Sequence, residues 1–320
     1  MKKLIAVLLI LSIAAFAFAS GSGQKGGGAS GAIKVGIINN PPSESGYRTA
    51  NDKDFKDFFT SANGYAPSFS YSDKLEEQLV AFNQFVTNGV DYILLSAAAT
   101  DGWDDALRSA QRAGVKVFLF DRMISAPNSL YEAAVVSDMA QEGITAVNWL
   151  KNQNLSAYNV IHLQGVMGSD AQLGRTAALD AEFNAGRMKK IIQQTGNWSA
   201  DEARAIVQSV INAGTSFNVI YAENDDMAKG AVAALDAAGI THGVRGNVVV
   251  MGFDCNKWAL RELLAGNWNY DGQCSPFQAS VIDGMIKGTT PIQKKVISEE
   301  KGFDAKTISQ ADVDKYGLGE

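Results

Sequence analysis

The chain has 320 residues, of which 46% are hydrophobic and 19% are charged, a composition typical of a globular protein rather than a disordered one. At about 150 residues per domain, this length predicts about two domains. The net charge of −6 argues against general nucleic-acid binding, which needs a basic face. Two cysteines and two histidines are too few for a disulfide scaffold, a cysteine zinc site or most histidine-dependent catalytic sites. We therefore expect a soluble binding protein with no cofactor and no metal.

The first 31 residues have the pattern of an exported protein. Lys2 and Lys3 precede an apolar stretch that ends in Ala-Phe-Ala, which predicts that residues 1–19 are a signal peptide cleaved near Ala19. The stretch is too short to span a membrane. Residues 20–31 are rich in glycine and serine and predict a flexible leader, and no cysteine there could carry a lipid anchor. We therefore expect the mature chain to fold in the periplasm or at the cell surface.

From residue 32 onward, short apolar runs alternate with longer amphipathic stretches. The predicted strands are 32–38, 91–97, 115–121, 159–165, 218–225 and 247–254. The predicted helices are 74–89, 101–114, 139–154, 170–186, 201–213, 226–239 and 256–266. Nearly continuous apolarity is typical of strands buried on both faces, and strand–helix alternation predicts parallel sheets covered by helices. The predicted fold class is α/β, with two Rossmann-like lobes.

Polar, planar side chains follow several of these strands. Asp121 and Arg122 end one strand, Asn224 follows another and Asp254 ends a third, while Arg175 follows a glycine-containing loop. In open α/β sheets, ligands bind beyond the carboxyl ends of the strands. Sugar hydroxyls donate to carboxylates and accept from guanidinium groups, so this set suits a neutral polyol.

Five motifs occur in the order in which they occur in one known family. They are SESGYR at 43–48, ATDGW at 99–103, LFDR at 119–122, the glycine loop and arginine of 163–175, and YAENDDM at 221–227. Together they resemble the type I periplasmic sugar-binding proteins of ABC importers, most of all the galactofuranose-binding subgroup. The resemblance covers roughly residues 33–300.

The resemblance implies a periplasmic binding protein-like I fold whose three connecting segments cross near residues 137, 275 and 292. Its domains would be an N-terminal lobe of 32–137 plus 276–292 and a C-terminal lobe of 138–275 plus 293–320.

The resemblance also implies a set of sugar-binding residues. Asp121 and Arg122 match the pair that holds adjacent hydroxyls in the first lobe. The second lobe would contribute Arg175, Asn224, Asp254 and Gln273, the aromatic rings would be those of Tyr47, Trp103 and Trp198, and Glu44 and Arg48 would lie at or near the ligand. Tyr47 stands where the family usually has tryptophan or phenylalanine. Each residue also has a structural alternative as an ion pair, a helix cap or a core aromatic.

The two cysteines follow two predicted ligand residues, Asp254 and Gln273, on strands that should be neighbours. In an oxidising compartment Cys255 and Cys274 are therefore a possible disulfide. The alternative is two buried thiols.

By resemblance, the protein captures a monosaccharide, galactofuranose or a related furanose or pyranose, and delivers it to an ABC transporter permease. It would act as a monomer and would not be an enzyme. One alternative is the sensing subunit of a chemotaxis or quorum receptor, which would contact a chemoreceptor. Another is an exported enzyme.

Overall fold

The computed structural model describes residues 31–319, in which twelve strands form two six-stranded sheets. The predicted signal peptide, its cleavage site and nearly all of the predicted leader lie outside the described residues. By their contacts, residues 32–320 form one compact unit. None of the described helices has the length and apolarity that a bilayer span requires.

The first sheet has the strand order β11-β5-β4-β3-β1-β2, and all its strand pairs are parallel. Its strands are β1 (Ile33–Asn39), β2 (Tyr65–Tyr71), β3 (Tyr92–Leu95), β4 (Lys116–Asp121), β5 (Ala133–Val136) and β11 (Lys295–Ile297). The helices that accompany it are α1 (Gly46–Phe58), α2 (Leu75–Thr87), α3 (Asp104–Ala113) and α9 (Ala279–Lys287). We call these elements the first lobe.

The second sheet has the order β12-β10-β9-β8-β6-β7 and is parallel except for β12, which pairs antiparallel with β10. Its strands are β6 (Asn159–Gln164), β7 (Lys189–Thr195), β8 (Val219–Ala222), β9 (Val249–Phe253), β10 (Tyr270–Gly272) and β12 (Gly302–Asp304). Its helices are α4 (Met139–Lys151), α5 (Asp170–Asn184), α6 (Ala200–Asn212), α7 (Asp225–Ala237), α8 (Lys257–Leu264) and α10 (Gln310–Tyr316). We call these elements the second lobe.

The α/β class is confirmed, and all six predicted strands and all seven predicted helices are present with shifted ends. Several elements lacked a strong signal. The edge strand β7 reads KKIIQQT and is only partly buried, so it has no continuous apolar run. Residues 46–58 are not among the predicted helices, yet they form α1, which the Ser45 side chain caps by accepting a hydrogen bond from the Arg48 backbone N–H.

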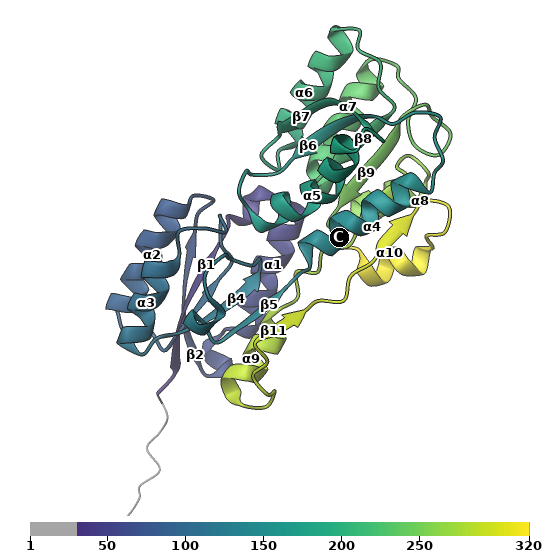
Figure 1. The fold of residues 1–320 in the computed structure, drawn as a ribbon. Coiled ribbons are helices and arrows are strands. Elements are labelled where there is room, and N and C mark those ends of the chain that lie inside the picture. The colour runs from purple at the N-terminus through teal and green to yellow at the C-terminus, as the bar shows by residue number, and fades with distance from the viewer. Residues whose placement is uncertain (1–30, 320) are drawn as a thin grey trace, which may run out of the picture. The chain divides into compact units, whose positions relative to one another are not determined.

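Three segments connect the lobes: 137–138, 273–278 and 298–301. The first two agree with the expected crossings near 137 and 275. The third follows Ile297 instead of lying near residue 292, because β11 pairs with β5 and so belongs to the first lobe. Figure 1 shows β11 and α9, drawn in yellow-green, beside the purple and blue elements of the first lobe.

Helices α4 and α5 pack with their backbones in close contact. A Cβ atom on Gly174 would lie 2.5 Å from the Met139 carbonyl carbon, and one on Gly143 would lie 2.8 Å from the Gly174 carbonyl oxygen. Only glycine permits this approach. It places Arg175 of α5 beside Glu142 of α4, a pair on which the site described below depends.

We predict that Gly174→Ala forces α5 away from α4 and lowers the free energy of unfolding by about 1–3 kcal/mol. Denaturant unfolding would measure the change. The control is Leu173→Ala, on the same helix but at an exposed position, which should change stability by no more than about 0.5 kcal/mol. Equal stability of the two variants would contradict the proposed close packing.

Candidate functional site

A cleft lies between the carboxyl ends of the two sheets and is lined from both lobes. The first lobe, including the segment between β1 and α1, contributes Glu44, Ser45, Tyr47, Asp121 and Arg122. The second lobe and the segment after β10 contribute Met139, Ala171, Arg175, Trp198, Asn224, Asp254 and Cys274. The cleft therefore brings together eight of the eleven residues expected at a sugar site: Glu44, Tyr47, Asp121, Arg122, Arg175, Trp198, Asn224 and Asp254. Arg48, Trp103 and Gln273 are not among its lining residues.

Asp121 is the centre of the first-lobe side of the cleft. Tyr47 donates its hydroxyl proton to Asp121 Oδ1 at 2.7 Å, and Ser96 donates to Oδ2 at 2.8 Å. The Arg48 guanidinium lies 2.9 Å from Oδ2. Burial acts to raise the pKa of Asp121, but Arg48, Arg122 and these hydrogen bonds hold it below its ordinary value. Asp121 is therefore a fixed, ionised acceptor at neutral pH.

Arg48 is fully buried behind Asp121 and does not line the cleft. Its guanidinium also donates to Asn39 Oδ1 at 2.8 Å and to Asn51 Oδ1 at 3.2 Å. Of the two places expected for Arg48, at the ligand or near it, its buried position on α1 favours the second, because it holds Asp121 from behind. Sequence reasoning missed Asn39, Asn51 and Ser96, whose only signal was their place at or next to strand ends and on the capped helix.

Arg175 has the corresponding place in the second lobe. Its Nε donates to Glu142 Oε2 at 2.7 Å, its NH2 group lies 3.5 Å from Asp254 Oδ1, and its NH1 group donates to the carbonyl oxygen of Glu223. Burial raises the pKa of Asp254 well above its ordinary value, and Arg175 opposes that shift only in part. The cleft thus has an ionised carboxylate on one side and a carboxyl group that retains a proton more readily on the other.

Two donors in the cleft have no hydrogen-bond acceptor among the described residues. They are Arg122 Nε, which lies 3.5 Å from Asp121 Oδ2 without hydrogen-bond geometry, and the buried indole Nε1 of Trp198. The Trp198 ring packs on Gly165, where a Cβ atom would lie 1.8 Å from it, and the Arg122 guanidinium lies 5.9 Å from the ring centre. Both residues line the cleft, Arg122 from the first lobe and Trp198 from the second.

Asn224 lines the cleft and also caps α7. Its Oδ1 accepts from the Met227 backbone N–H at 2.9 Å, and its Nδ2 donates to the Trp198 carbonyl oxygen at 3.3 Å. Asn224 is therefore a helix cap, which was its structural alternative. Its side chain also supports the loop that carries Trp198.

Trp103 and Gln273 lie away from the cleft. The Trp103 ring is fully buried in the first-lobe core beside Phe82, and its Nε1 donates to the Ala99 carbonyl oxygen at 2.9 Å. It is a core aromatic, as the structural alternative expected. Gln273 pairs its backbone N–H with the Lys301 carbonyl oxygen and lines a second cavity beside the connecting segments. Both are corrected as direct ligand residues.

The lobes contact each other at the rim of the cleft. The Thr100 backbone N–H donates to the Gly168 carbonyl oxygen at 3.1 Å, and the Met123 N–H donates to Asp170 Oδ2 at 2.8 Å. The cavity that remains has a volume of ≈ 20 Å³, room for about one water molecule. This arrangement is a closed one, and a sugar would require the lining groups to move apart.

The expected disulfide is not formed, because Cys255 and Cys274 are both free, buried thiols. Cys255 has a left-handed backbone with φ of +62°, and its N–H donates to Asp271 Oδ1. Cys274 instead lines the cleft, with its Sγ 3.6 Å from Ser137 Oγ. Burial raises the pKa of both thiols well above the ordinary value, so both are protonated at neutral pH.

We predict that iodoacetamide labels neither cysteine appreciably in the folded protein, and that it labels two per chain after unfolding without a reductant. The reason is that protonated, buried thiols react slowly. Intact-mass measurement would count the labels. Absence of labelling in the unfolded, unreduced chain would show that a disulfide had formed.

The chain matches one protein family and several characterised relatives. Residues 35–279 match the family described as periplasmic binding protein domain. A fructose import binding protein of Bifidobacterium longum is 31% identical over 97% of this chain and 96% of its own. The galactofuranose-binding protein of Escherichia coli is 34% identical over 63% of this chain and 65% of its own length.

Solved structures show the same similarity. The crystal structure of a galactofuranose binding protein superposes with a TM-score of 0.80 at 29% identity, covering 89% of this chain and 98% of that one. The arabinose-transporter binding protein of Shewanella sp. ANA-3, solved with arabinofuranose, gives a TM-score of 0.79 at 26% identity over 88% and 95%.

Proposed function

Because the chain belongs to the periplasmic binding protein family, we propose that its cleft captures one monosaccharide between the two lobes and presents it to an ABC importer. The relatives that it matches are import binding proteins rather than enzymes, and the proposed role is binding without catalysis. This family works outside the cytoplasm. The predicted signal peptide, cleaved near Ala19, would place the protein in the periplasm or at the cell surface.

The pair of unpartnered donors, Arg122 Nε and Trp198 Nε1, is the observation that carries the proposal. An uncharged polyol has oxygens that accept from such donors, and each hydroxyl can also donate to an acceptor such as Asp121. A carboxylate ligand would instead meet the ionised Asp121, which lies in the same cavity. The polar set thus favours a neutral sugar that reaches both lobes.

The ring form proposed for the sugar rests on the names of the matched relatives and not on the geometry of the cleft. The names of several matched proteins mention a furanose sugar, either galactofuranose or arabinofuranose. Another name mentions fructose, a ketose that also forms a furanose ring. We propose a furanose as the first choice, with galactofuranose foremost, and pyranose pentoses and hexoses next.

The partner proposed for the closed form is a permease, since the names of the matched relatives describe import. In this proposal the protein acts as a monomer, and the sugar that contacts both lobes shifts the population toward the closed form that the permease recognises.

We predict that Arg122→Ala weakens sugar binding at least tenfold, about 1.4 kcal/mol, because it removes a donor that has no other acceptor. Titration calorimetry with the best ligand would measure the affinity. Arg108→Ala, which removes an exposed arginine of α3, is the matched control and should bind with the affinity of the unmodified protein. Equal affinities of the two variants would remove Arg122 from the site.

A thermal-shift screen identifies the ligand and tests the proposal as a whole. Galactofuranose, arabinofuranose, fructose, ribose and galactose would each be added to the mature chain. A true ligand at 100 times its Kd should stabilise the fold by about 2.7 kcal/mol. No response to any of these sugars would contradict the proposed function.

A further inference from the structure

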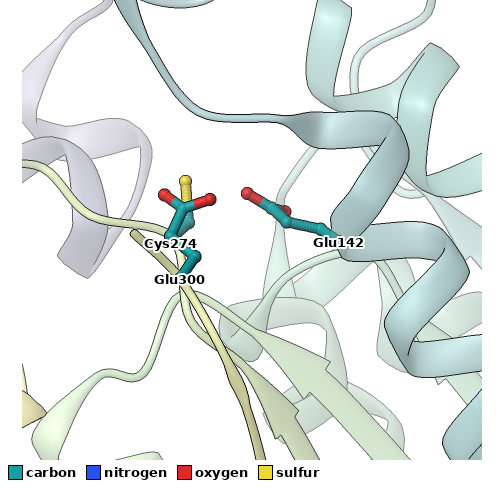
Figure 2. Close-up of side chains that lie close together, drawn as sticks. All are labelled: Glu142, Cys274 and Glu300. Atoms are coloured by element: carbon teal, nitrogen blue, oxygen red, sulfur yellow. The ribbon is translucent and has the colours of Figure 1, made fainter. Parts of the chain in front are cut away.

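Three side chains that are not among the expected sugar ligands converge beside the segments that connect the lobes. Glu142 lies in the first turn of α4, directly after the first segment, Cys274 lies in the second segment and Glu300 in the third. One ligand atom of each lies within 4.8 Å of those of the other two. Figure 2 shows the three side chains pointing toward one another.

The Glu142 carboxylate has one oxygen that nothing in the described chain satisfies. Its Oε2 accepts from Arg175 Nε, whereas Oε1 is buried and has no hydrogen-bond partner. The residue as a whole is only 6% exposed. A buried, unpaired carboxylate oxygen is costly, so either a cation or a proton belongs beside it.

The other ligands are held in place by hydrogen bonds. Glu300 Oε1 accepts from Ser137 Oγ at 2.5 Å and from the Ser275 backbone N–H at 2.8 Å. Together with Arg175 on Glu142, these contacts orient both carboxylates, as outer-shell partners do at metal sites. A cavity of ≈ 130 Å³ is lined by Glu142 and Glu300 and gives an ion a path of entry.

We propose that Glu142, Cys274 and Glu300 form a binding site for a single zinc-like divalent cation. One thiolate and two carboxylates fit zinc, which accepts both sulfur and oxygen, better than calcium or magnesium, which take oxygen ligands alone. A tetrahedral site spaces its ligand atoms by about 3.5 Å, so atoms that lie within 4.8 Å of one another would have to move together by up to about 1.3 Å. Water would complete the coordination.

A bound cation would join the second and third connecting segments, through Cys274 and Glu300, to the first turn of α4, through Glu142. Its ligand Glu142 also holds Arg175, which lines the sugar cleft. The site would therefore stiffen the hinge and couple metal occupancy to the geometry of the cleft. Because Cys274 itself lines the cleft, it is shared by both sites.

The competing occupant is a proton. Burial, with the charge of Glu142, raises the pKa of Glu300 to about 9, so a proton shared by the two carboxyl groups could neutralise them instead. Metal binding would displace that proton and the thiol proton. Zinc binding in solution distinguishes the two occupants.

The test uses the reduced, chelator-treated mature chain without sugar, so its result does not depend on the proposed function. Calorimetric titration with Zn²⁺ should show one site per chain. Substitution with Co²⁺ should give a thiolate-to-cobalt charge-transfer absorption, which reports a sulfur ligand directly. Both signals should be lost in Cys274→Ser and weakened at least tenfold in Glu300→Gln.

The matched control is Cys255→Ser, which removes the other buried cysteine but none of the proposed ligands. It should retain both signals. A melting curve of each variant checks its fold, and if Cys274→Ser does not fold, Glu300→Gln decides. No saturable binding by the unmodified chain would overturn the proposal in favour of the shared proton. Equal binding by Glu300→Gln and the unmodified chain would show adventitious binding and overturn it as well.

Discussion

The buried ion pair between Arg48 and Asp121 is the interaction on which the first-lobe half of the cleft depends. Both side chains are almost completely removed from water. A buried charge is tolerated only when it is paired and hydrogen-bonded, and removing one partner typically costs about 3–5 kcal/mol. Tyr47 and Ser96 each donate a further hydrogen bond to the Asp121 carboxylate. The site is therefore rigid before any ligand arrives, because its own charge balance orders it.

The second lobe repeats this construction. Asp254 directly follows β9 and Asp121 ends β4, and each lies beside a buried arginine supplied by a helix, Arg175 or Arg48. Both aspartates have positive φ angles, +66° for Asp121 and +112° for Asp254. Such backbone costs about 1–3 kcal/mol per residue and persists only where the surroundings impose it. The strain turns the carboxyl groups out of the line of the strands and into the cleft.

The sequence was most informative where function coincides with the end of a regular element. Asp121, Arg122 and Asp254 follow apolar runs that are unmistakable as strands, and parallel strands bring their carboxyl ends to one edge. Arg48 and Trp103 each end another of the five motifs, yet both side chains are buried in the first lobe. A motif predicts which residues lie near the site. The direction in which the local backbone points each side chain then decides whether it reaches the cleft.

Long-range pairings were the least predictable part. The position of β11 in the sheet depends on its hydrogen bonds to β5, which lies more than 150 positions earlier in the chain. This strand is short and has only one partly buried residue, so no apolar pattern in the sequence predicts it. The meeting of Glu142, Cys274 and Glu300 has the same origin. No metal-binding spacing exists along the chain, because the three connecting segments bring these residues together only after both lobes have formed.

The free energy of closing the cleft depends on the buried hydrogen-bond donors that closure leaves without an acceptor. Few polar contacts join the rims, and closure brings Arg122 of one lobe near Trp198 of the other with no acceptor for either donor. Each unpaired buried donor costs about 1–3 kcal/mol, so closing the cleft by itself is opposed by its own lining. A ligand with oxygens at both positions removes that penalty in the closed form alone. A ligand that stabilises the closed form more than the open form shifts the equilibrium between them toward the closed form. The same two donors therefore contribute both to the affinity for the ligand and to closure of the cleft.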